Sequence, residues 1–454
     1  MLSCFTTSAP SAISIIPVIT DQFNTWLEKQ NTQIKTWVNT VNFIAKPESF
    51  CLIPGADGKI ASVLIGIKDA QDFWSFGHLS TALPPQQYTI ENATVNFQQI
   101  ALAWGLGSYQ FTRYKQSTKT IAQLLLPEKD AKAIENIVTS IFLVRDLINT
   151  PTEDMGPAEL AQAAEKLAKE FKAEFSQITG DDLLKNNYPT IHAVGRASTR
   201  LPRLIDIHWG DANAPKITLV GKGVCFDTGG LDIKPASGMA LMKKDMAGAA
   251  HVLGLARMIM AAKLPVRLRV LIPAVENVIA GNAFKPGDVI TTRKGLTVEV
   301  TNTDAEGRLI LCDALAEAST ENPDILIDIA TLTGAARVAV GTDISAMFAN
   351  QAALAQQILK YAEQENDPTW QLPLYTPYRK WFDSAVADMA NSSSQPYGGA
   401  ITAALFLKEY VAPEIAWAHF DIMAWNVSSR PGRPEGGEAM AIRAIFRYLA
   451  DRFK

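Results

Sequence analysis

The sequence predicts an α/β protein of two domains, a smaller N-terminal α/β domain and a larger C-terminal α/β/α sandwich around a mainly parallel central sheet. The first observation is length, because 454 residues exceed what a single hydrophobic core usually holds. The second is that segments with strand-like and helix-like apolar spacing alternate from about residue 150 onward. Such alternation is typical of a sheet with helices on both faces.

Residues 1–130 are predicted to form the smaller domain. They mix short strands, such as "SVLIGI", with helical stretches, such as "NFQQIALAWGLGSYQF". A helical pattern then runs from residue 128 and stops before Pro151, since a proline disfavours helical geometry in the residue before it. We interpret residues 131–151 as a connecting helix and residues 152–454 as the larger domain.

The larger domain shows a series of apolar segments separated by turn residues. Segments of strand length and one of helix length follow one another, with a further helix expected after Arg308: "PRLIDIHW", "KITLVG", the helix "AGAAHVLGLARMIMAA", "VRLRVLIPAV", "LTVEV", "DILIDIA", "ISAMFA" and "IAWAHFDI". This order predicts repeated strand–helix units.

Composition excludes several classes of protein. Hydrophobic residues make up 48% and charged residues 19%, which is typical of a globular chain. The net charge of -4 and the lack of a dense Lys/Arg block disfavour nucleic acid as a partner. Four scattered cysteines without CxxC spacing favour a reducing compartment. No apolar run is long enough to span a membrane, and the N-terminus lacks the charged start of a signal peptide. We therefore expect a cytoplasmic protein.

A first cluster of charges lies in "TNTDAEGRLIL", directly after the strand-like "GLTVEV". In an extended segment Asp304, Glu306 and Arg308 would share one face, because side chains alternate along a strand. The apolar spacing of the following residues predicts a helix, so the charges are expected at a strand-to-helix junction, where α/β sheets build their sites. The alternative is a solvated strand end without function.

A second cluster lies in "KITLVGKGVCFDTGGLDIKPASGMALMKKDMAGAA". Lys222 ends an apolar strand, Asp227 and a glycine pair follow, and then come Lys234 and Asp245, the latter at the start of the long helix. A strand, glycines and a helix also suggest a phosphate-binding loop, but neither GxxxxGK[ST] nor GxGxxG is present.

The two clusters together supply four carboxylates. Asp227, Asp245, Asp304 and Glu306 would repel one another in a partly buried place unless cations lay among them, and two divalent metals would balance them. Carboxylate oxygens suit Mg²⁺ and Mn²⁺ and also hold Zn²⁺. No HExxH motif is present. A pair of metals can activate water, so the residues indicate a dinuclear hydrolase of unspecified substrate.

Both clusters closely resemble the leucyl (cytosol) aminopeptidase family of dinuclear metallopeptidases. "NTDAEGRL" matches the signature octapeptide of that family in full, and "VGKGVCFDTGG", "DIKP" and "MKKDMAGAA" match its metal and lysine motifs in the same order. "RDLINTP" and "WAHFDI" also look like family sequence. The resemblance covers roughly residues 145–450. It implies that residues 152–454 form a catalytic metallopeptidase domain.

The resemblance implies a ligand set for two divalent ions, Zn²⁺, Mn²⁺ or Mg²⁺. The tightly held metal would be bound by Lys222, Asp227, Asp245 and Glu306, and the more exchangeable metal by Asp227, Asp304 and Glu306. Lys222 would bind only as the neutral amine, which requires a strong lowering of its pKa.

The resemblance also implies catalytic and substrate-binding roles. Lys234 would stabilise negative charge on the scissile carbonyl, and Arg308 would hold a bicarbonate ion that acts as general base. Met242, Thr331 and Gly334 match the pocket for the first side chain, which would favour leucine-like residues of peptides with a free N-terminus. The metals and Asp245 would bind the α-amine. The assembly expected from the family is a homohexamer.

Two other functions compete with this hypothesis. Some relatives bind DNA as regulators, which the acidic charge balance disfavours here, and the four carboxylates also permit a two-metal phosphoesterase. Three features depart from the family pattern: Cys225 stands near a metal ligand, Lys244 precedes Asp245, and residues 421–426 read "DIMAWN". We interpret Cys225 as a small buried residue, with a metal-binding or oxidisable thiol as the alternative. Lys244 is a candidate for altering metal binding or substrate preference.

Overall fold

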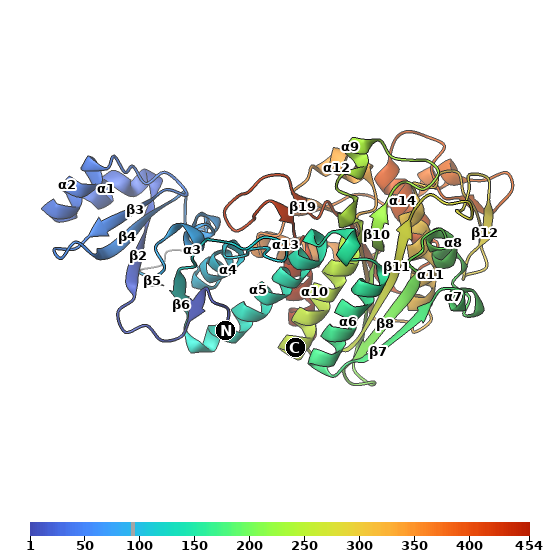
Figure 1. Cartoon of the computed structure of the whole chain (residues 1–454), viewed down its shortest axis with the longest axis horizontal. Helices are drawn as coiled ribbons and strands as arrows, with labels where there is room; N and C mark the ends of the chain where they lie inside the picture. Colours follow the sequence, from blue (N-terminus) through green and yellow to red (C-terminus); the bar gives the residue numbers. More distant parts are fainter. Residues whose placement is uncertain (92–95) are drawn as a thin grey trace. The chain divides into compact units, whose positions relative to one another are not determined.

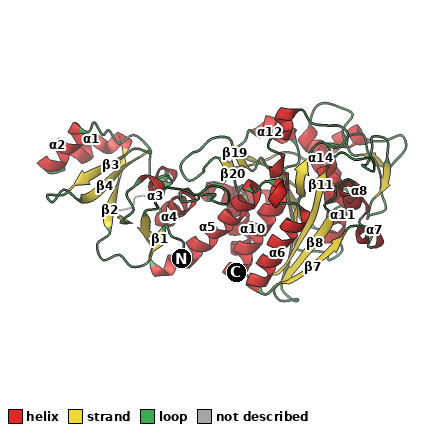
Figure 2. Cartoon of the chain, in the orientation of Figure 1, coloured by secondary structure: helices red, strands yellow, loops and turns green. Residues whose placement is uncertain are grey.

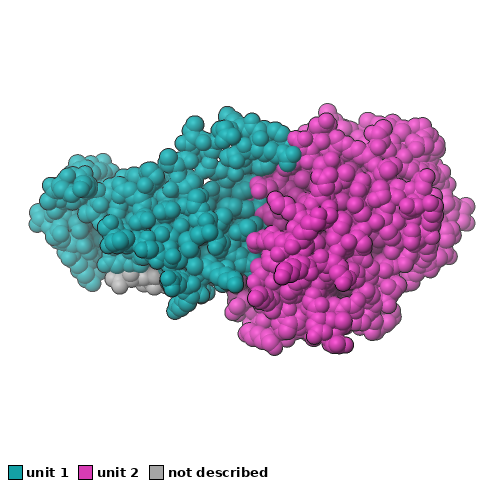
Figure 3. All heavy atoms as spheres, turned by 60° about the horizontal axis from the view of Figure 1, so that its bottom comes forward, with its two compact units in different colours: residues 1–142, 426–436 teal, residues 143–425, 437–454 magenta. Residues whose placement is uncertain are grey.

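The computed structural model describes residues 1–91 and 96–454, which fall into two compact units (Figure 3). Unit 1 comprises residues 1–142 and 426–436, and unit 2 comprises residues 143–425 and 437–454. Each unit contains its own sheet, and the unit boundary falls within the long helix α5 (Glu128–Asn149). This helix ends before Pro151, as the sequence predicts.

Unit 1 is built on a six-stranded sheet of order β1-β6-β5-β2-β4-β3. All neighbours pair in parallel except β3 and β4, which are antiparallel. Its strands are β1 (Phe5–Thr6), β2 (Ile13–Ile19), β3 (Phe50–Pro54), β4 (Ile60–Ile67), β5 (Gln87–Ile90) and β6 (Gln123–Leu125). Its helices are η1 (Thr20–Gln22), α1 (Phe23–Glu28), α2 (Thr32–Thr40), η2 (Trp74–Phe76), α3 (Leu79–Ala82) and α4 (Phe97–Gly107).

Unit 2 is built on a larger sheet of order β16-β15-β18-β14-β9-β11-β8-β7, with β10 paired to β11. Its centre is parallel, whereas β15–β18, β11–β8 and β8–β7 are antiparallel. The strands are β7 (Glu174–Thr179), β8 (Arg203–Trp209), β9 (Lys216–Gly221), β10 (Gly223–Asp227), β11 (Arg267–Asn277), β14 (Ile325–Ala330), β15 (Ser345–Ala349), β16 (Thr369–Gln371) and β18 (Ala416–Asp421). The expected α/β fold with a mainly parallel sheet is confirmed.

Helices cover both faces of this sheet (Figures 1 and 2). α6 (Pro157–Phe171) and α10 (Ala247–Ala262) lie on one face, and α8 (Pro189–Gly195) and α11 (Glu306–Ser319) lie on the other (Figure 1). All six residues of β14 are buried, as expected for a strand covered on both sides. Gly248 lets α10 approach closely, because a Cβ there would lie 2.1 Å from the carbonyl oxygen of Ile329.

The remaining elements of unit 2 surround this core. They are η3 (Thr152–Asp154), α7 (Asp182–Lys185), α9 (Ala236–Met239), η4 (Met242–Met246), α12 (Gly334–Val340), α13 (Ala352–Gln364), η5 (Thr376–Phe382), α14 (Gly399–Lys408) and α15 (Ile442–Arg452). Two short strands, β19 (Trp425–Asn426) and β20 (Gly436–Gly437), adjoin the limits of residues 426–436. Within residues 1–91 and 96–454, no helix combines the length and apolar character needed to cross a membrane.

One predicted strand does not belong to the main sheet. "LTVEV" yields only β13 (Thr297–Glu299), which pairs with β12 (Val289–Thr291) and β17 (Met389–Ala390) in a separate three-stranded sheet. Only Val298 of β13 is buried, because the segment is too short to cross the core. The charges that follow it therefore do not extend from a strand of the central sheet.

Candidate active site

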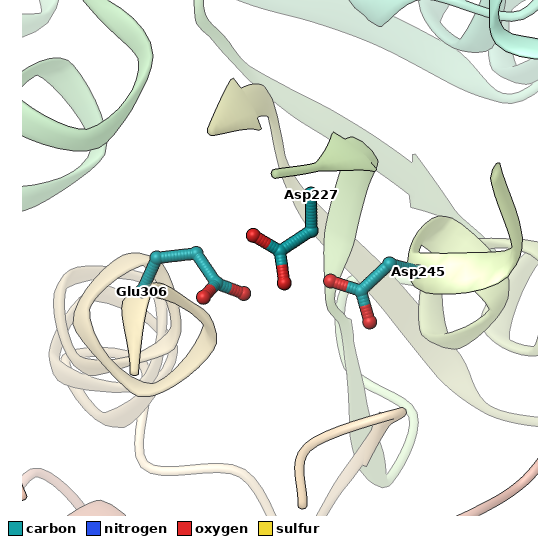
Figure 4. Close-up of side chains that lie close together, drawn as sticks. All are labelled: Asp227, Asp245 and Glu306. Carbon is teal, nitrogen blue, oxygen red and sulfur yellow. The ribbon is translucent and has the colours of Figure 1, made fainter. Parts of the chain in front are cut away.

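Buried acidic side chains meet beside the carboxyl end of strand β10. Asp227 is the last residue of β10, Asp245 lies in η4 just before α10, and Glu306 is the first residue of α11. One carboxylate oxygen from each lies within 4.8 Å of the others, and all three residues are buried. Figure 4 shows the three carboxylates turned toward a common space. Parallel α/β sheets place their sites at this edge.

The local conformation of the octapeptide differs from the extended segment expected. Asp304 lies in a turn, while Glu306 and Arg308 belong to the first turn of α11, so the three residues do not share one strand face. The helical pattern extends back to Glu306 and overrides the alternation of charges. Gly307 has a clear steric role, because a Cβ there would lie 2.7 Å from Nζ of Lys222.

Lys222 pairs with two acids of the cluster. Lys222 directly follows β9. Its Nζ lies 2.7 Å from Oδ2 of Asp245 and 2.9 Å from Oε1 of Glu306. The ammonium also donates to the carbonyl oxygen of Thr331 at 3.2 Å. Burial lowers the pKa of Lys222, but the charges of Asp245 and Glu306 outweigh burial and raise its pKa overall. In the metal-free protein this lysine therefore acts as a counter-charge.

Lys234 neutralises the other side of the cluster. Its Nζ lies 2.8 Å from Oδ2 of Asp227 and also pairs with Asp304. Burial and the nearby Asp245 raise the pKa of Asp227 to about 6, and burial and Asp227 raise the pKa of Glu306 to about 7. The carboxylates of Asp227 and Glu306 are thus destabilised by burial and by like charge, which is the pattern expected for a site that takes cations.

Asn277 is a site residue that the sequence did not single out. Its Nδ2 donates to Oδ1 of Asp227 at 2.9 Å and to the carbonyl oxygen of Thr303 at 3.1 Å. The same Oδ1 accepts the backbone N–H of Gly229 at 2.8 Å. Asn277 thereby fixes one carboxylate oxygen and leaves the other facing the cluster. Its only sequence signal is its place at the end of the apolar strand β11.

Of the three residues expected to contact the substrate, the structure describes a hydrogen bond to the cluster for Thr331 alone. Thr331 donates from Oγ1 to Oδ1 of Asp245 at 2.7 Å. Met242 is buried in η4, in the same short helix as Asp245. Gly334 begins α12, three residues after Thr331, and is exposed.

Arg308 is buried near the cluster and retains hydrogen-bonding capacity. Its Nε has no hydrogen-bond partner among the residues that the structure describes. Burial lowers the pKa of Arg308 to about 10, and the charges of Glu306 and Asp421 oppose that effect. A buried guanidinium with a free donor is suited to a small oxyanion.

Two of the departures from the family pattern are also buried. Burial raises the pKa of the Cys225 thiol far above its ordinary value, which favours a small buried residue over a reactive thiol. Lys244 is only 2% exposed. Burial lowers the pKa of Lys244 to about 8, Asp245 opposes this effect, and Arg337 lowers the pKa further.

The donor set fits divalent cations. Glu306 contributes a buried oxygen, Oε2, that has no hydrogen-bond partner within the described part of the chain. Asp227, Asp245 and Glu306 supply hard oxygen ligands within one small volume. Unpartnered buried carboxylate oxygens are costly unless a cation or donor reaches them. The fold and this site are those expected of a metal-dependent hydrolase.

Comparison with known proteins identifies the family. The model of the cytosol aminopeptidase family, catalytic domain, matches residues 142–446, and that of the M17 aminopeptidase N-terminal domain matches residues 13–127. The chain belongs to the cytosol aminopeptidase family and is an aminopeptidase, a metal-dependent hydrolase.

Three relatives illustrate the similarity. A crystal structure of cytosol aminopeptidase from Coxiella burnetii is 51% identical, covers 100% of both chains and has a TM-score of 0.97. The bottromycin maturation enzyme BotP in complex with Mn is 30% identical, over 98% of this chain and 100% of its own, with a TM-score of 0.87. A probable cytosol aminopeptidase from Roseiflexus castenholzii is 40% identical over 76% of this chain and 74% of its own length.

Proposed function

We propose that this aminopeptidase releases apolar, preferably leucine-like, N-terminal residues from peptides with a free N-terminus. The observation that carries the proposal is the buried convergence of Asp227, Asp245 and Glu306 on one volume, with Lys222 against two of them. The acids and the lysine of this cluster include no hydroxyl or thiol side chain, so activation of water is the chemistry that the donor set favours.

The cluster would hold two divalent ions. Lys222, Asp227, Asp245 and Glu306 would bind the tight metal, and Asp227, Asp304 and Glu306 would bind the exchangeable one. When bound, such a pair of ions supplies Lewis-acid polarisation of the scissile carbonyl and activation of water. The similarity to BotP, whose structure contains Mn, supports Mn²⁺, and oxygen-rich ligand sets also accept Zn²⁺ or Mg²⁺.

The side chains around the acids would bind and orient the reacting groups. Asp245 would accept a hydrogen bond from the substrate α-amine, which restricts cleavage to the N-terminus. Lys234 would donate to the carbonyl oxygen as negative charge develops there. Arg308 would hold a bicarbonate ion as general base, a role supported by its buried Nε, for which the structure describes no hydrogen-bond partner.

The remaining assignments concern the substrate pocket and the organisation of the protein. Met242, Thr331 and Gly334 would line the pocket for the first side chain, where apolar contacts give modest discrimination. We propose an N-terminal domain of residues 1–130, a connecting helix of 131–151 and a catalytic domain of 152–454, which the matches to the two domain models support. We also propose a cytoplasmic homohexamer.

The test is hydrolysis of leucyl-p-nitroanilide by purified protein before chelation, after it, and after addition of Mn²⁺ or Zn²⁺. Activity should disappear with chelator, return with metal and be absent in Asp304→Ala. Glu174→Gln, which removes an exposed carboxylate on β7, is the control and should behave as the wild type. A metal-loaded protein inactive on all aminoacyl anilides would contradict the proposal. DNA binding in a low-salt gel shift, or aryl-phosphate turnover, would then support the two alternatives.

A further inference from the structure

A second arginine lies beside the proposed substrate pocket without a described role. Arg337 is in α12, three residues after Gly334, and residues at this spacing lie on one side of a helix. A Cβ built at Gly334 would lie 3.3 Å from Nη2 of Arg337, so the guanidinium covers this glycine. Gly334 is one of the three residues proposed to line the pocket for the first side chain.

The guanidinium also reaches the segment after β18. Its Nη1 lies 3.8 Å from Sδ of Met423, a long and weak contact for such a strong donor. No carboxylate of residues 1–91 or 96–454 forms an ion pair with Arg337. Arg337 therefore lies between Gly334 and Met423 with most of its donor capacity unused.

Asp421, the acid two residues before Met423, already has other partners. Its Oδ1 accepts the backbone N–H groups of Leu332 and Thr333 at 2.9 and 3.1 Å, and its Oδ2 accepts the hydroxyl of Thr333 at 2.6 Å. These bonds hold the turn that leads into α12. Asp421 thus positions the turn, and the structure describes no ion pair between it and Arg337.

A second cation adds to the positive charge at this place. Lys244 is buried two residues after Met242. Its positive charge is repelled by that of Arg337, although the negative charge of Asp245 acts on Lys244 more strongly. The structure describes no ion pair of Lys244 with a carboxylate oxygen. A pocket bounded by Met242, Thr331 and Gly334 would therefore have uncharged walls and a positively charged end.

We propose that Arg337 is a specificity-determining residue that binds the side-chain carboxylate of an N-terminal glutamate, in addition to the apolar residues that the pocket walls favour. Glutamate has an aliphatic stem of leucine-like length and ends in a planar anion that matches the two-pronged guanidinium. An N-terminal lysine or arginine is repelled by the same group. This inference rests on the proposed function, because it assigns one end of the same pocket.

The first test uses the wild-type enzyme and two isosteric substrates. The α-p-nitroanilides of glutamate and glutamine differ in charge but not in size, and kcat/KM should be about tenfold to a hundredfold higher for the glutamyl substrate, as expected for a charged hydrogen bond. The difference should lie mainly in KM. An equal or lower value for glutamate overturns the inference.

The second test changes the charge of the arginine. Arg337→Met should lower the glutamyl-to-leucyl ratio of kcat/KM about tenfold to a hundredfold, and Arg337→Lys should restore part of the ratio. Arg337→Glu should reverse the preference and raise the lysyl-to-leucyl ratio, which a purely structural role would not do. The control Arg447→Met removes an exposed arginine of α15 and should retain the wild-type ratios.

The results separate the two proposals. If the metal-loaded wild type hydrolyses neither leucyl nor glutamyl substrate, the proposed function fails. The role of Arg337 alone fails if the wild type hydrolyses the leucyl substrate but has a low glutamyl-to-leucyl ratio of kcat/KM, and if this ratio is unchanged in Arg337→Met and Arg337→Glu. A wild-type preference for glutamate over glutamine that disappears in Arg337→Met supports it, even if one of the other variants does not fold.

Discussion

The buried carboxylate of Asp367 and those of the acidic cluster, both in unit 2, are arranged in opposite ways. The Asp367 side chain caps the N-terminus of α15: Oδ1 accepts the N–H of Ala441 at 3.1 Å, and Oδ2 accepts the N–H of Arg443 and Ala444 at 3.0 and 3.3 Å. Its charge is thus stabilised by the donors of a helix N-terminus.

The carboxylates of the acidic cluster instead face one another. Glu306 retains an oxygen without a described partner, and burial and Asp227 raise its pKa to about 7. One arrangement stabilises the fold, whereas the other is costly until a ligand arrives. The difference teaches that hydrogen-bond satisfaction, more than burial, separates a structural carboxylate from a functional one.

The largest expected effect comes from the acidic cluster. Glu306→Gln keeps the size of the side chain but removes a charge that both proposed metals would share, so kcat/KM on leucyl-p-nitroanilide should fall by roughly a thousandfold or more. In the presence of chelator, the free energy of unfolding of this variant should change little, because the substitution removes a buried charge that Asp227 repels. Urea titration and steady-state kinetics measure both quantities. A Gln variant with near wild-type activity would remove Glu306 from the site.

Asp367 should show the converse behaviour. Asp367→Ala leaves three backbone donors without their acceptor and removes the carboxylate that pairs with Arg443 at 3.7 Å, so the free energy of unfolding should fall by roughly 4 kcal/mol. At a temperature where the variant is folded, the ratio of glutamyl to leucyl hydrolysis should not move. A loss of under about 1 kcal/mol in urea titration would show that Asp367 is not a stabilising cap.

A buried histidine extends the comparison to a neutral group. His251 is fully buried, accepts the N–H of Met440 at Nε2 and contacts the carbonyl oxygen of Ala247 through Nδ1. Burial lowers the pKa of His251 to about 4, although the bond to Ala247 and two acids oppose this. The unfolded chain binds the proton more readily, so stability is present above pH 6.5 and is lost as the pH falls toward 4.

The size of this loss can be measured directly. The lowered pKa of His251 corresponds to about 3 kcal/mol at pH 4 and to much less at pH 6. His251→Gln removes the titrating group, so its stability should depend less steeply on pH between 6.5 and 4 than that of the wild type. Parallel pH dependences of the two proteins would exclude this assignment.

The smallest effect is expected at an exposed, uncharged cap in unit 1. Asn31 accepts the N–H of Ile34 at 2.9 Å at the start of α2. Asn31→Ala should cost about 1 kcal/mol, because water can replace part of an exposed cap. Hydrogen exchange of the α2 amides reports the change locally. A cost as large as that at Asp367 would mean that burial and charge do not set the strength of these caps.

Sequence patterns predicted much of the main sheet because the central strands are rich in apolar residues. β14 and β11 are of this kind, and both are buried along almost their whole length. The strand β7 was missed because most of its residues are exposed or half-buried and its pattern is weak. The antiparallel pairing of β15 with β18 depends on long-range contacts that no local pattern records.

The sequence predicted the site residues that lie in short local motifs and missed those that only the fold brings to the site. The octapeptide and the segment from Lys222 to Asp245 carry their residues in short motifs, and the structure brings Lys222, Asp227, Asp245 and Glu306 together. Asn277 is fifty residues from Asp227, so only the register of β10 and β11 places them side by side. Arg337 likewise contacts Met423, which lies 86 residues away in the chain, so no local pattern records this contact.

The metal content of the protein tests the central claim most directly. The purified chain would be stripped with chelator, dialysed against Mn²⁺, freed of excess metal and measured by elemental mass spectrometry. The account predicts about two ions per chain for the wild type, a loss of the exchangeable ion in Asp304→Asn, and little retained metal in Glu306→Gln. If the wild type retains no more Mn²⁺ than Glu306→Gln, the buried acids are not a metal centre.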